Sequence, residues 1–203
     1  MAVYSGQPMR RHFYGLSLTT LATALFFLLS SPCRASIFDP ARDEIAILAG
    51  YGQSIPGWGL TTERVETIDL VPRYNHVAFD NLGWGWWRGN YCTMVESPVH
   101  LVVNPDTSLM VGLNFLGRYS FTAATAWQPY IFGGGGPVYS FADIKGMGAK
   151  LNGNYQFAIG LEHPTSTGHA LLLELRYHHI SNAGVSDPNV PLNSLKVLFG
   201  MTF

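Results

Sequence analysis

The sequence is poor in cysteine and lacks the usual cofactor motifs. It has two cysteines among 203 residues, Cys33 and Cys92, and Cys33 lies in the N-terminal segment described below. With Cys92 left alone, no intramolecular disulfide is expected, and such a residue is more often a small buried apolar group than a nucleophile. Neither a zinc-ligand spacing nor a phosphate-binding glycine motif is present, so we expect no metal and no organic cofactor.

Charge is also scarce. Charged residues make up 12% of the chain, whereas soluble domains usually carry about 25%. Lys and Arg number 12 against 13 Asp and Glu, and three of the arginines belong to the N-terminal segment. The remainder is therefore mildly acidic, which argues against a nucleic-acid partner.

The N-terminal segment has the anatomy of a secretory signal peptide. A basic region at Arg10 and Arg11 precedes an apolar run that ends near Leu29. Cys33 and Ala35 supply the small residues of a cleavage site, so we expect residues 1–35 to be removed and residues 36–203 to form one domain. A membrane-anchoring helix is the alternative, and the short apolar run disfavours it.

Beyond residue 35 the chain lacks an apolar run long enough for a membrane helix, yet it is rich in aromatics and glycine. A chain that spans a membrane without helices must form a closed barrel, because only closure satisfies every backbone polar group without water. Spanning strands of about 9–11 residues then alternate lipid-facing apolar side chains with polar or small ones.

This alternation is clearest from Leu195 to Phe203, where every odd position is large and apolar. A last strand that ends in Phe resembles the terminal signal that barrel-assembly machinery recognises in outer-membrane proteins. The predicted strands span residues 43–53, 64–78, 91–104, 109–121, 127–142, 151–162, 169–182 and 193–203. The pattern predicts an all-β protein, an eight-stranded antiparallel transmembrane β-barrel whose interior is filled by side chains.

Glycine and tryptophan mark further features of this barrel. The run Gly133 to Gly136 predicts a bulge or a narrow place in the wall, since a phosphate-binding loop would need a helix to follow it. Trp84, Trp86, Trp87 and Trp127 are predicted anchors at the membrane interface. Core aromatics of a soluble sandwich are the alternative interpretation of these tryptophans.

The predicted strand 169–182 changes character near its end. Three of its even positions are polar and are predicted to face the lumen: Glu174, Arg176 and His178. The odd positions begin with leucines and then continue as His179 and Ser181, two polar side chains on the lipid-facing side. Polar groups that face lipid are costly, so they invite a functional explanation.

Asn193, in the final strand, shares this outward parity. A hairpin symmetric about Asp187 would make Ser181 and Asn193 cross-strand neighbours. With both termini in the periplasm, the polar cluster would lie at the outer-leaflet edge, where lipopolysaccharide resides. There Ser181 could attack a lipid ester with His179 as general base and a third group orienting the imidazole. The alternative is a pair of interface residues that contact headgroups.

The hexapeptide His179-Ile180-Ser181-Asn182-Ala183-Gly184, followed by Asp187-Pro188-Asn189 and the final strand, resembles the lipid A 3-O-deacylases of the PagL type. Weaker similarity runs over residues 90–203. The resemblance implies an eight-stranded barrel of the bacterial outer membrane with its active site on the outer surface. It also implies lipid A or lipopolysaccharide as substrate and no cofactor, and it leaves a homodimer open.

The same resemblance implies roles for individual residues. Ser181 would be the nucleophile and His179 its base, while Asn182 and the backbone N–H of Gly184 would form the oxyanion site. The best-known family members have Glu twelve residues after the serine, where this chain has Asn193. An amide can accept a hydrogen bond from the imidazole, but it cannot balance the charge of an imidazolium.

Two other hypotheses stay open. One is a non-catalytic outer-membrane barrel that binds lipid or strengthens the membrane, and the departure at position 193 keeps it in play. The other is a soluble lipocalin-like binding barrel, which the Phe203 terminus and the outward apolar faces disfavour.

Overall fold

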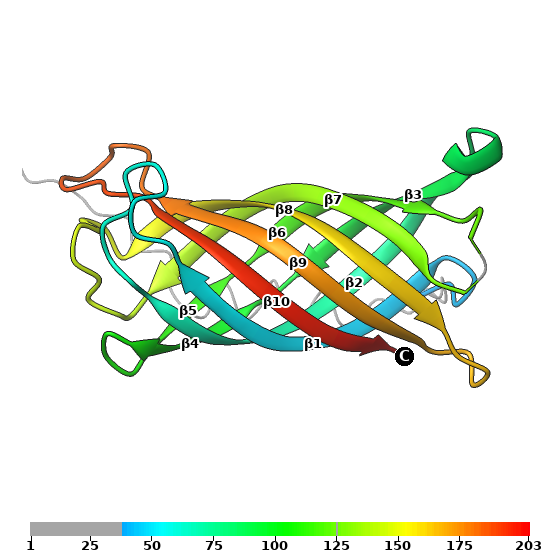
Figure 1. Ribbon diagram of the computed structural model, residues 1–203, viewed down its shortest axis with the longest axis horizontal. Coiled ribbons are helices and arrows are strands. Elements are labelled where there is room, and N and C mark those ends of the chain that lie inside the picture. Colours follow the sequence, from blue (N-terminus) through cyan, green and yellow to red (C-terminus); the bar gives the residue numbers. More distant parts are fainter. Residues whose placement is uncertain (1–37, 125) are drawn as a thin grey trace, which may run out of the picture. The chain divides into compact units, whose positions relative to one another are not determined.

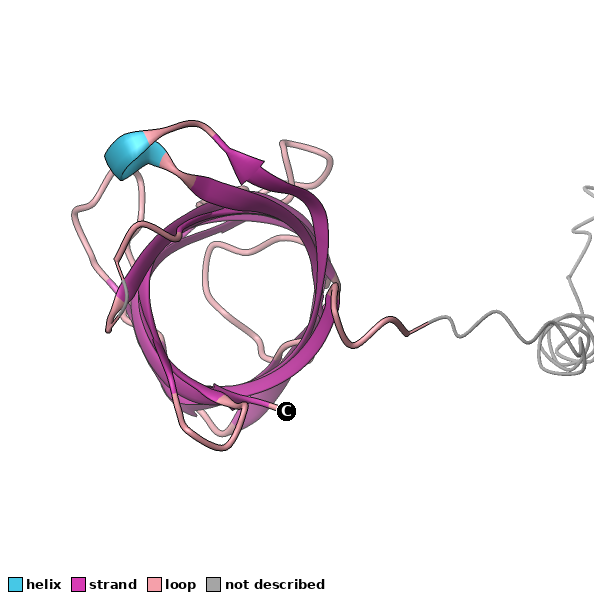
Figure 2. Cartoon of the chain, turned by 90° about the vertical axis from the view of Figure 1, so that its right-hand side faces the viewer, coloured by secondary structure: helices cyan, strands magenta, loops and turns pink. Residues whose placement is uncertain are grey.

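The computed structural model describes residues 38–203 except residue 125, so the predicted signal peptide lies outside the described residues. Within this part the chain forms one antiparallel sheet that curls into a ring (Figures 1 and 2). The strands are β1 (Asp43–Ser54), β2 (Glu66–Leu82), β3 (Gly89–Glu96), β4 (Val99–Asn104), β5 (Ser108–Gly112), β6 (Asn114–Phe121), β7 (Gln128–Ser140), β8 (Leu151–Pro164), β9 (Ala170–Ser181) and β10 (Leu192–Thr202).

These segments make eight long strands, because β3 and β4 are two halves of one strand, and β5 and β6 are two halves of another. β3 and β4 are separated at Ser97 and Pro98, and β2 pairs with both of them in turn. Pro98 has no N–H to donate, which explains the break. β5 and β6 are separated at Leu113, and both pair with β7. Since β1 pairs with β2 and with β10, the ring is closed and the predicted eight-stranded barrel is confirmed.

The short 3-10 turn η1 (Gly85–Trp87) connects β2 to β3. No helix in residues 38–203, leaving out residue 125, is long and apolar enough to cross a membrane. Trp84, which precedes this turn, is 85% exposed, and Trp86 within it is 69% exposed. Their role as interface anchors stays a prediction.

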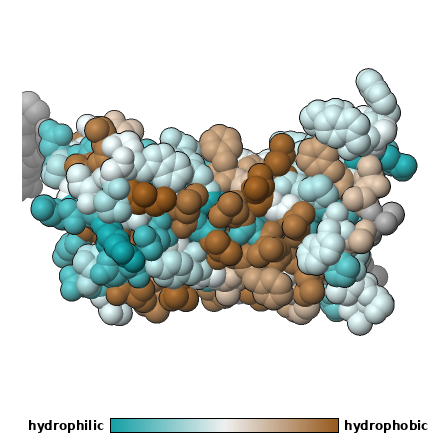
Figure 3. All heavy atoms as spheres, in the orientation of Figure 1, coloured by the Kyte–Doolittle hydropathy of each residue, from teal (hydrophilic) through white to brown (hydrophobic). Residues whose placement is uncertain are grey.

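The two faces of the wall differ as the alternation predicts. In β10, Val197 and Phe199 are 54% and 58% exposed, whereas Lys196 and Leu198, which point inward, are 4% and 1% exposed. Apolar side chains gather over the middle of the outer surface (Figure 3). An apolar outer belt over a filled, largely polar interior is the arrangement of a small transmembrane barrel.

Four charged side chains meet in the middle of the lumen. Arg73 contacts Glu96 at 2.8 Å and Glu174 at 2.7 Å, and Arg176 contacts Glu96 at 2.9 Å. All four side chains are almost fully buried, and their two positive and two negative charges balance. The predicted inward orientation of Glu174, Arg176 and His178 is therefore confirmed.

The end of the barrel that lies away from the C-terminus carries the loops 55–65, 141–150 and 182–191 (Figure 1). We call it the site end. Beneath these loops the lumen is filled by a buried apolar cluster, which consists of Val65, Val102, Met110, Val138, Ala142, Ile144, Ile180 and Leu192. Side chains therefore close the barrel at this end.

The glycine run in β7 allows the neighbouring strands to approach closely. A Cβ on Gly135 would lie 2.0 Å from the carbonyl oxygen of Asn154 in β8, and one on Gly136 would lie 2.0 Å from that of Leu113. The ladder between β7 and β8 continues without a shift through this run. Of the two predicted outcomes, a bulge is absent from the β7–β8 ladder, and the narrow place stays a prediction.

We expect Glu96→Leu to destabilise the barrel by about 3–5 kcal/mol, because it leaves two buried guanidinium groups with one carboxylate. The free energy of unfolding can be measured by urea titration in lipid vesicles, with heat-modifiable gel mobility as the reporter. Glu66→Leu is the matched control, since Glu66 pairs with the exposed Arg64 at 2.7 Å. Equal losses in the two variants would contradict a structural role for the buried charges.

Candidate active site

The register between β9 and β10 decides which polar residues meet on the outer face. Asn193 lies opposite His179, not opposite Ser181. The predicted pairing of Ser181 with Asn193 was therefore wrong by two residues. The reason is that β9 and β10 pair from Ile180 and Leu192 onward, which centres the hairpin on Ser186 rather than Asp187. The parity was right, because a shift of two residues keeps a side chain on the same face.

His179, Ser181 and Asn193 form a hydrogen-bonded chain. The Nδ1 atom of His179 lies 2.7 Å from Oδ1 of Asn193, and its Nε2 atom lies 3.1 Å from Oγ of Ser181. An amide oxygen can only accept, so Nδ1 carries the hydrogen and Nε2 keeps a lone pair for the serine proton. His179 and Ser181 are half-buried, and Asn193 is 6% exposed.

Two tyrosines that the sequence analysis did not single out complete the surroundings of the imidazole. Tyr155 in β8 lies opposite His179, and its ring stacks on the imidazole with centroids 4.5 Å apart and planes inclined by 22°. The hydroxyl of Tyr177 donates to Oδ1 of Asn193 at 2.7 Å. Parity alone would have placed both tyrosines outward, but their contacts depend on the β8–β9–β10 register.

The loop 55–65 contacts the same cluster from the neighbouring hairpin. The side-chain amide of Asn193 donates to the carbonyl oxygen of Trp58 and to Oγ1 of Thr61, each at 2.9 Å. The backbone N–H of Asn193 also donates to Oγ1 of Thr61 at 2.9 Å. No sequence pattern connects residues 58 and 61 to residue 193, and only closure of β1 onto β10 brings them together.

The loop after Ser181 holds the predicted oxyanion donors. The N–H of Gly184 donates to Oδ1 of Asn182 at 2.9 Å, and the Asn182 amide donates to the carbonyl oxygen of Ser186 at 2.7 Å. Both predicted donors therefore bond within the loop and Asn182 is 5% exposed, so their role as oxyanion donors stays a prediction. Ala183 between them has φ +54°, a strained left-handed conformation of the kind found at functional sites.

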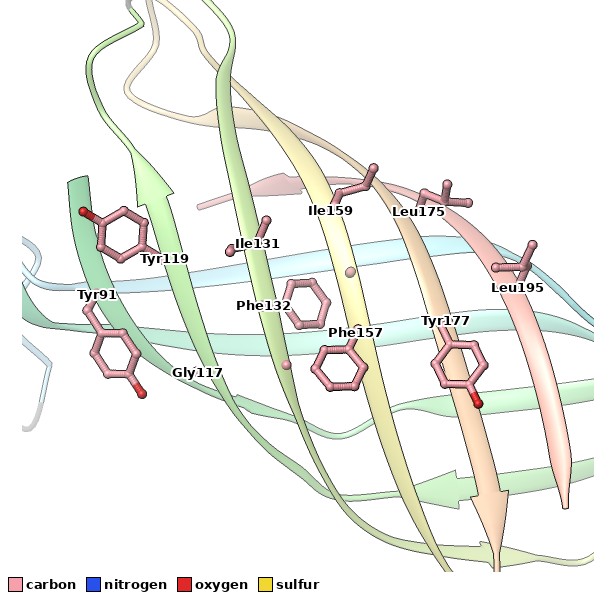
Figure 4. A pocket seen from close by; sticks show the side chains of 12 residues that line it. Tyr91, Gly117, Tyr119, Ile131, Phe132, Phe157, Ile159, Leu175, Tyr177 and Leu195 are labelled. Atoms are coloured by element: carbon pink, nitrogen blue, oxygen red, sulfur yellow. The ribbon is translucent and has the colours of Figure 1, made fainter. Parts of the chain in front are cut away.

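An apolar groove of about 580 Å³ runs along the outer wall beside this cluster (Figure 4). Gly117 and Gly133 form part of its floor, and one end is bounded by Tyr177, two residues from His179. The other wall-forming side chains shown in Figure 4 include Tyr91, Tyr119, Ile131, Phe157, Ile159, Leu175 and Leu195. The cluster therefore lies next to a surface that suits a hydrocarbon chain.

Two further histidines lie close together in the lumen, and a lysine lies beside them. His100 and His178 have ring centroids 5.5 Å apart, and the Lys196 ammonium binds Asp69 at 2.6 Å beside them. Among the residues that the structure describes, no group of three or more His, Cys, Asp or Glu side chains could hold a metal ion.

Comparison with known proteins identifies the family and the fold. The family model of lipid A 3-O-deacylase (PagL) matches residues 70–202, well over half of the chain. The crystal structure of the outer membrane enzyme PagL is similar, with TM-score 0.55 and 19% identity over 78% of this chain and 97% of that one.

A second structural relative shares the architecture at lower identity. Neisserial surface protein A (NspA) has TM-score 0.57 and 10% identity, over 79% of this chain and 95% of that one. No curated protein sequence matches the chain. The structural likenesses show the fold, and the family match rests on the sequence. The chain belongs to the lipid A 3-O-deacylase (PagL) family of outer-membrane ester hydrolases.

Proposed function

We propose that this deacylase cleaves the 3-O-acyl ester of lipid A with Ser181 as nucleophile, His179 as general base and Asn193 as the group that orients the imidazole. The observation that carries the proposal is the hydrogen-bonded chain of these three side chains on the outer face of the barrel. A nucleophile, a base and an orienting group within hydrogen-bond reach are the signature of an activated serine.

The reaction takes two steps. Oγ of Ser181 attacks the ester carbonyl carbon while Nε2 of His179 takes its proton, and the tetrahedral intermediate collapses when the imidazolium protonates the departing sugar oxygen. Water then attacks the acyl-serine, gives a proton to His179, and releases the free fatty acid as Ser181 recovers its hydrogen. The Asn182 amide and the Gly184 N–H stabilise the charge on the carbonyl oxygen.

The surface around Ser181 supports a membrane-embedded substrate. The serine is the last residue of β9, at the site end of the apolar belt, and the groove reaches Tyr177 on the same strand. Gly117 and Gly133 leave part of its floor without side chains. An acyl chain in this groove would stay in contact with hydrocarbon while its ester reaches the serine. Because lipid is as apolar as this wall, the groove positions the acyl chain and adds little hydrophobic free energy.

The imidazolium that forms on His179 faces no carboxylate in its hydrogen bonds, because both of its partners are neutral. Its stabilisation comes instead from the Tyr155 ring, which lies flat against the imidazole. The face of an aromatic ring attracts a cation by about 0.5–2 kcal/mol. Tyr155 thus offsets part of the missing charge at position 193.

The homodimer that the family resemblance leaves open is a separate hypothesis. The molecular mass of the purified protein in detergent, measured by analytical ultracentrifugation, decides between one and two chains. The mechanism above needs residues of a single chain only.

The proposal is tested by mass spectrometry of lipid A from cells that carry a 3-linked ester. We expect the native protein to remove one acyl chain and Ser181→Ala to leave lipid A unchanged. Ser166→Ala, in the exposed turn between β8 and β9, is the matched control and should behave as the native protein.

Equal folding of the variants is checked by heat-modifiable mobility. If native and Ser181→Ala proteins both leave lipid A intact, the non-catalytic barrel becomes the better explanation. If both remove the chain, Ser181 is not the nucleophile.

We expect Asn182→Ala to lower kcat by about 10²–10³-fold, because the transition state loses one oxyanion donor. Asn189→Ala is the companion variant, since it removes the bond to the backbone N–H of Asn182 at 3.0 Å but neither predicted donor. A kcat as low in Asn189→Ala as in Asn182→Ala would mean that loop order, not charge stabilisation, is lost.

Replacing the stacked ring tests the source of imidazolium stabilisation. We expect Tyr155→Leu to lower kcat roughly 2- to 30-fold with little change in KM, since the cation exists only after proton transfer. Tyr155→Phe keeps the ring face and should retain most of the activity. A loss as large in the Phe variant would point to the hydroxyl group instead.

A further inference from the structure

The amide of Asn193 has two orientations that differ only in which end faces His179. An amide oxygen toward the imidazole accepts the Nδ1 hydrogen, whereas an amide nitrogen there would donate and force the ring into the other tautomer. The second tautomer places a hydrogen on Nε2, where the lone pair for the Ser181 proton is needed. The activity of this site therefore depends on what holds the amide.

The loop 55–65 supplies acceptors to one end of the amide. The Trp58 carbonyl oxygen, which can only accept, lies 2.9 Å from Nδ2 of Asn193. The Thr61 hydroxyl donates its one hydrogen to the Pro191 carbonyl oxygen at 3.0 Å, so it too presents lone pairs to Nδ2 and to the Asn193 N–H. Thr61 is 3% exposed, so water does not compete with these bonds.

Donors surround the other end. The Tyr177 hydroxyl and the His179 ring each lie 2.7 Å from Oδ1. A reversed amide would put its oxygen against two acceptors, the Trp58 carbonyl and the Thr61 hydroxyl, and a buried polar group without a partner is costly. The ring of Trp58 packs on that of Tyr177 with centroids 5.0 Å apart, which fixes the loop against the same strand.

We propose that the Trp58 carbonyl and the Thr61 hydroxyl are positioning elements that orient Asn193 as an acceptor for His179 and make the site specific for an amide, rather than a carboxylate, at position 193. This inference rests on the proposed function and adds the loop 55–65 to it. A carboxylate at this position has no hydrogen for Trp58, so one of its oxygens would face a carbonyl oxygen at hydrogen-bond distance.

The inference reverses the expectation from serine hydrolases in general, where an acid at this position is far better than an amide. In this chain we expect Asn193→Asp to deacylate lipid A more slowly than the native protein. The Asn and Asp side chains have nearly the same size. The difference in rate would therefore come from the amide hydrogen that Asn193 donates to the Trp58 carbonyl oxygen, which Asp lacks.

Thr61→Val is the second variant, because it keeps the volume of the side chain and removes the hydroxyl. We expect kcat to fall roughly 10- to 100-fold, as two buried donors of Asn193 lose their acceptor, while KM stays near the native value. Thr61→Ser should restore most of the activity. Thr62→Val, at the exposed neighbouring position, is the matched control and should act as the native protein.

Nitrogen-15 NMR of the His179 imidazole in micelles gives a readout that needs no substrate. We expect the Nδ1–H tautomer in the native protein and in Thr61→Ser, and a mixture of tautomers in Thr61→Val. If the tautomers behave so but lipid A is never cleaved, the positioning holds and the proposed function fails. A native tautomer in Thr61→Val, or an Asn193→Asp variant as active as the native protein, would overturn the inference.

Discussion

Closure of the sheet by pairing β1 with β10 is the constraint on which everything else depends. It leaves no open strand edge in the described barrel whose backbone N–H and C=O groups would face lipid. It also fixes the side of the wall on which each side chain lies. It also carries the loop between β1 and β2 to the start of β10, where Thr61 and Asn193 meet across a long stretch of sequence. The candidate site is thus a product of the closed ring rather than of the last hairpin alone.

A neutral site suits this position at the edge of a membrane. A carboxylate buried to the extent of Asn193 would have to be desolvated, which costs several kcal/mol unless donors surround it. The amide avoids that cost and gives up electrostatic stabilisation of the imidazolium in return. In the proposed mechanism, the stacked Tyr155 ring and the fixed tautomer of His179 offset this loss.

Most of the barrel could be predicted from the sequence, because alternation with a period of two is a direct consequence of a wall with one lipid face. His179, Ser181 and Asn193 could be placed outward by the same parity. The register between the last two strands could not, since a shift by two residues keeps the parity and changes only the partners. Trp58, Thr61 and Tyr155 lie on strands or loops whose contacts arise only in the folded ring, so no local pattern marks them.

The apolar cluster beneath the loops of the site end has a consequence for the cell. Together with the buried charged side chains deeper in the lumen, it fills the inside of the described barrel at two levels. In the mechanism proposed above, a fatty acid released at Ser181 on the outer face would leave sideways into the surrounding leaflet, and the membrane itself would be the first acceptor of the product.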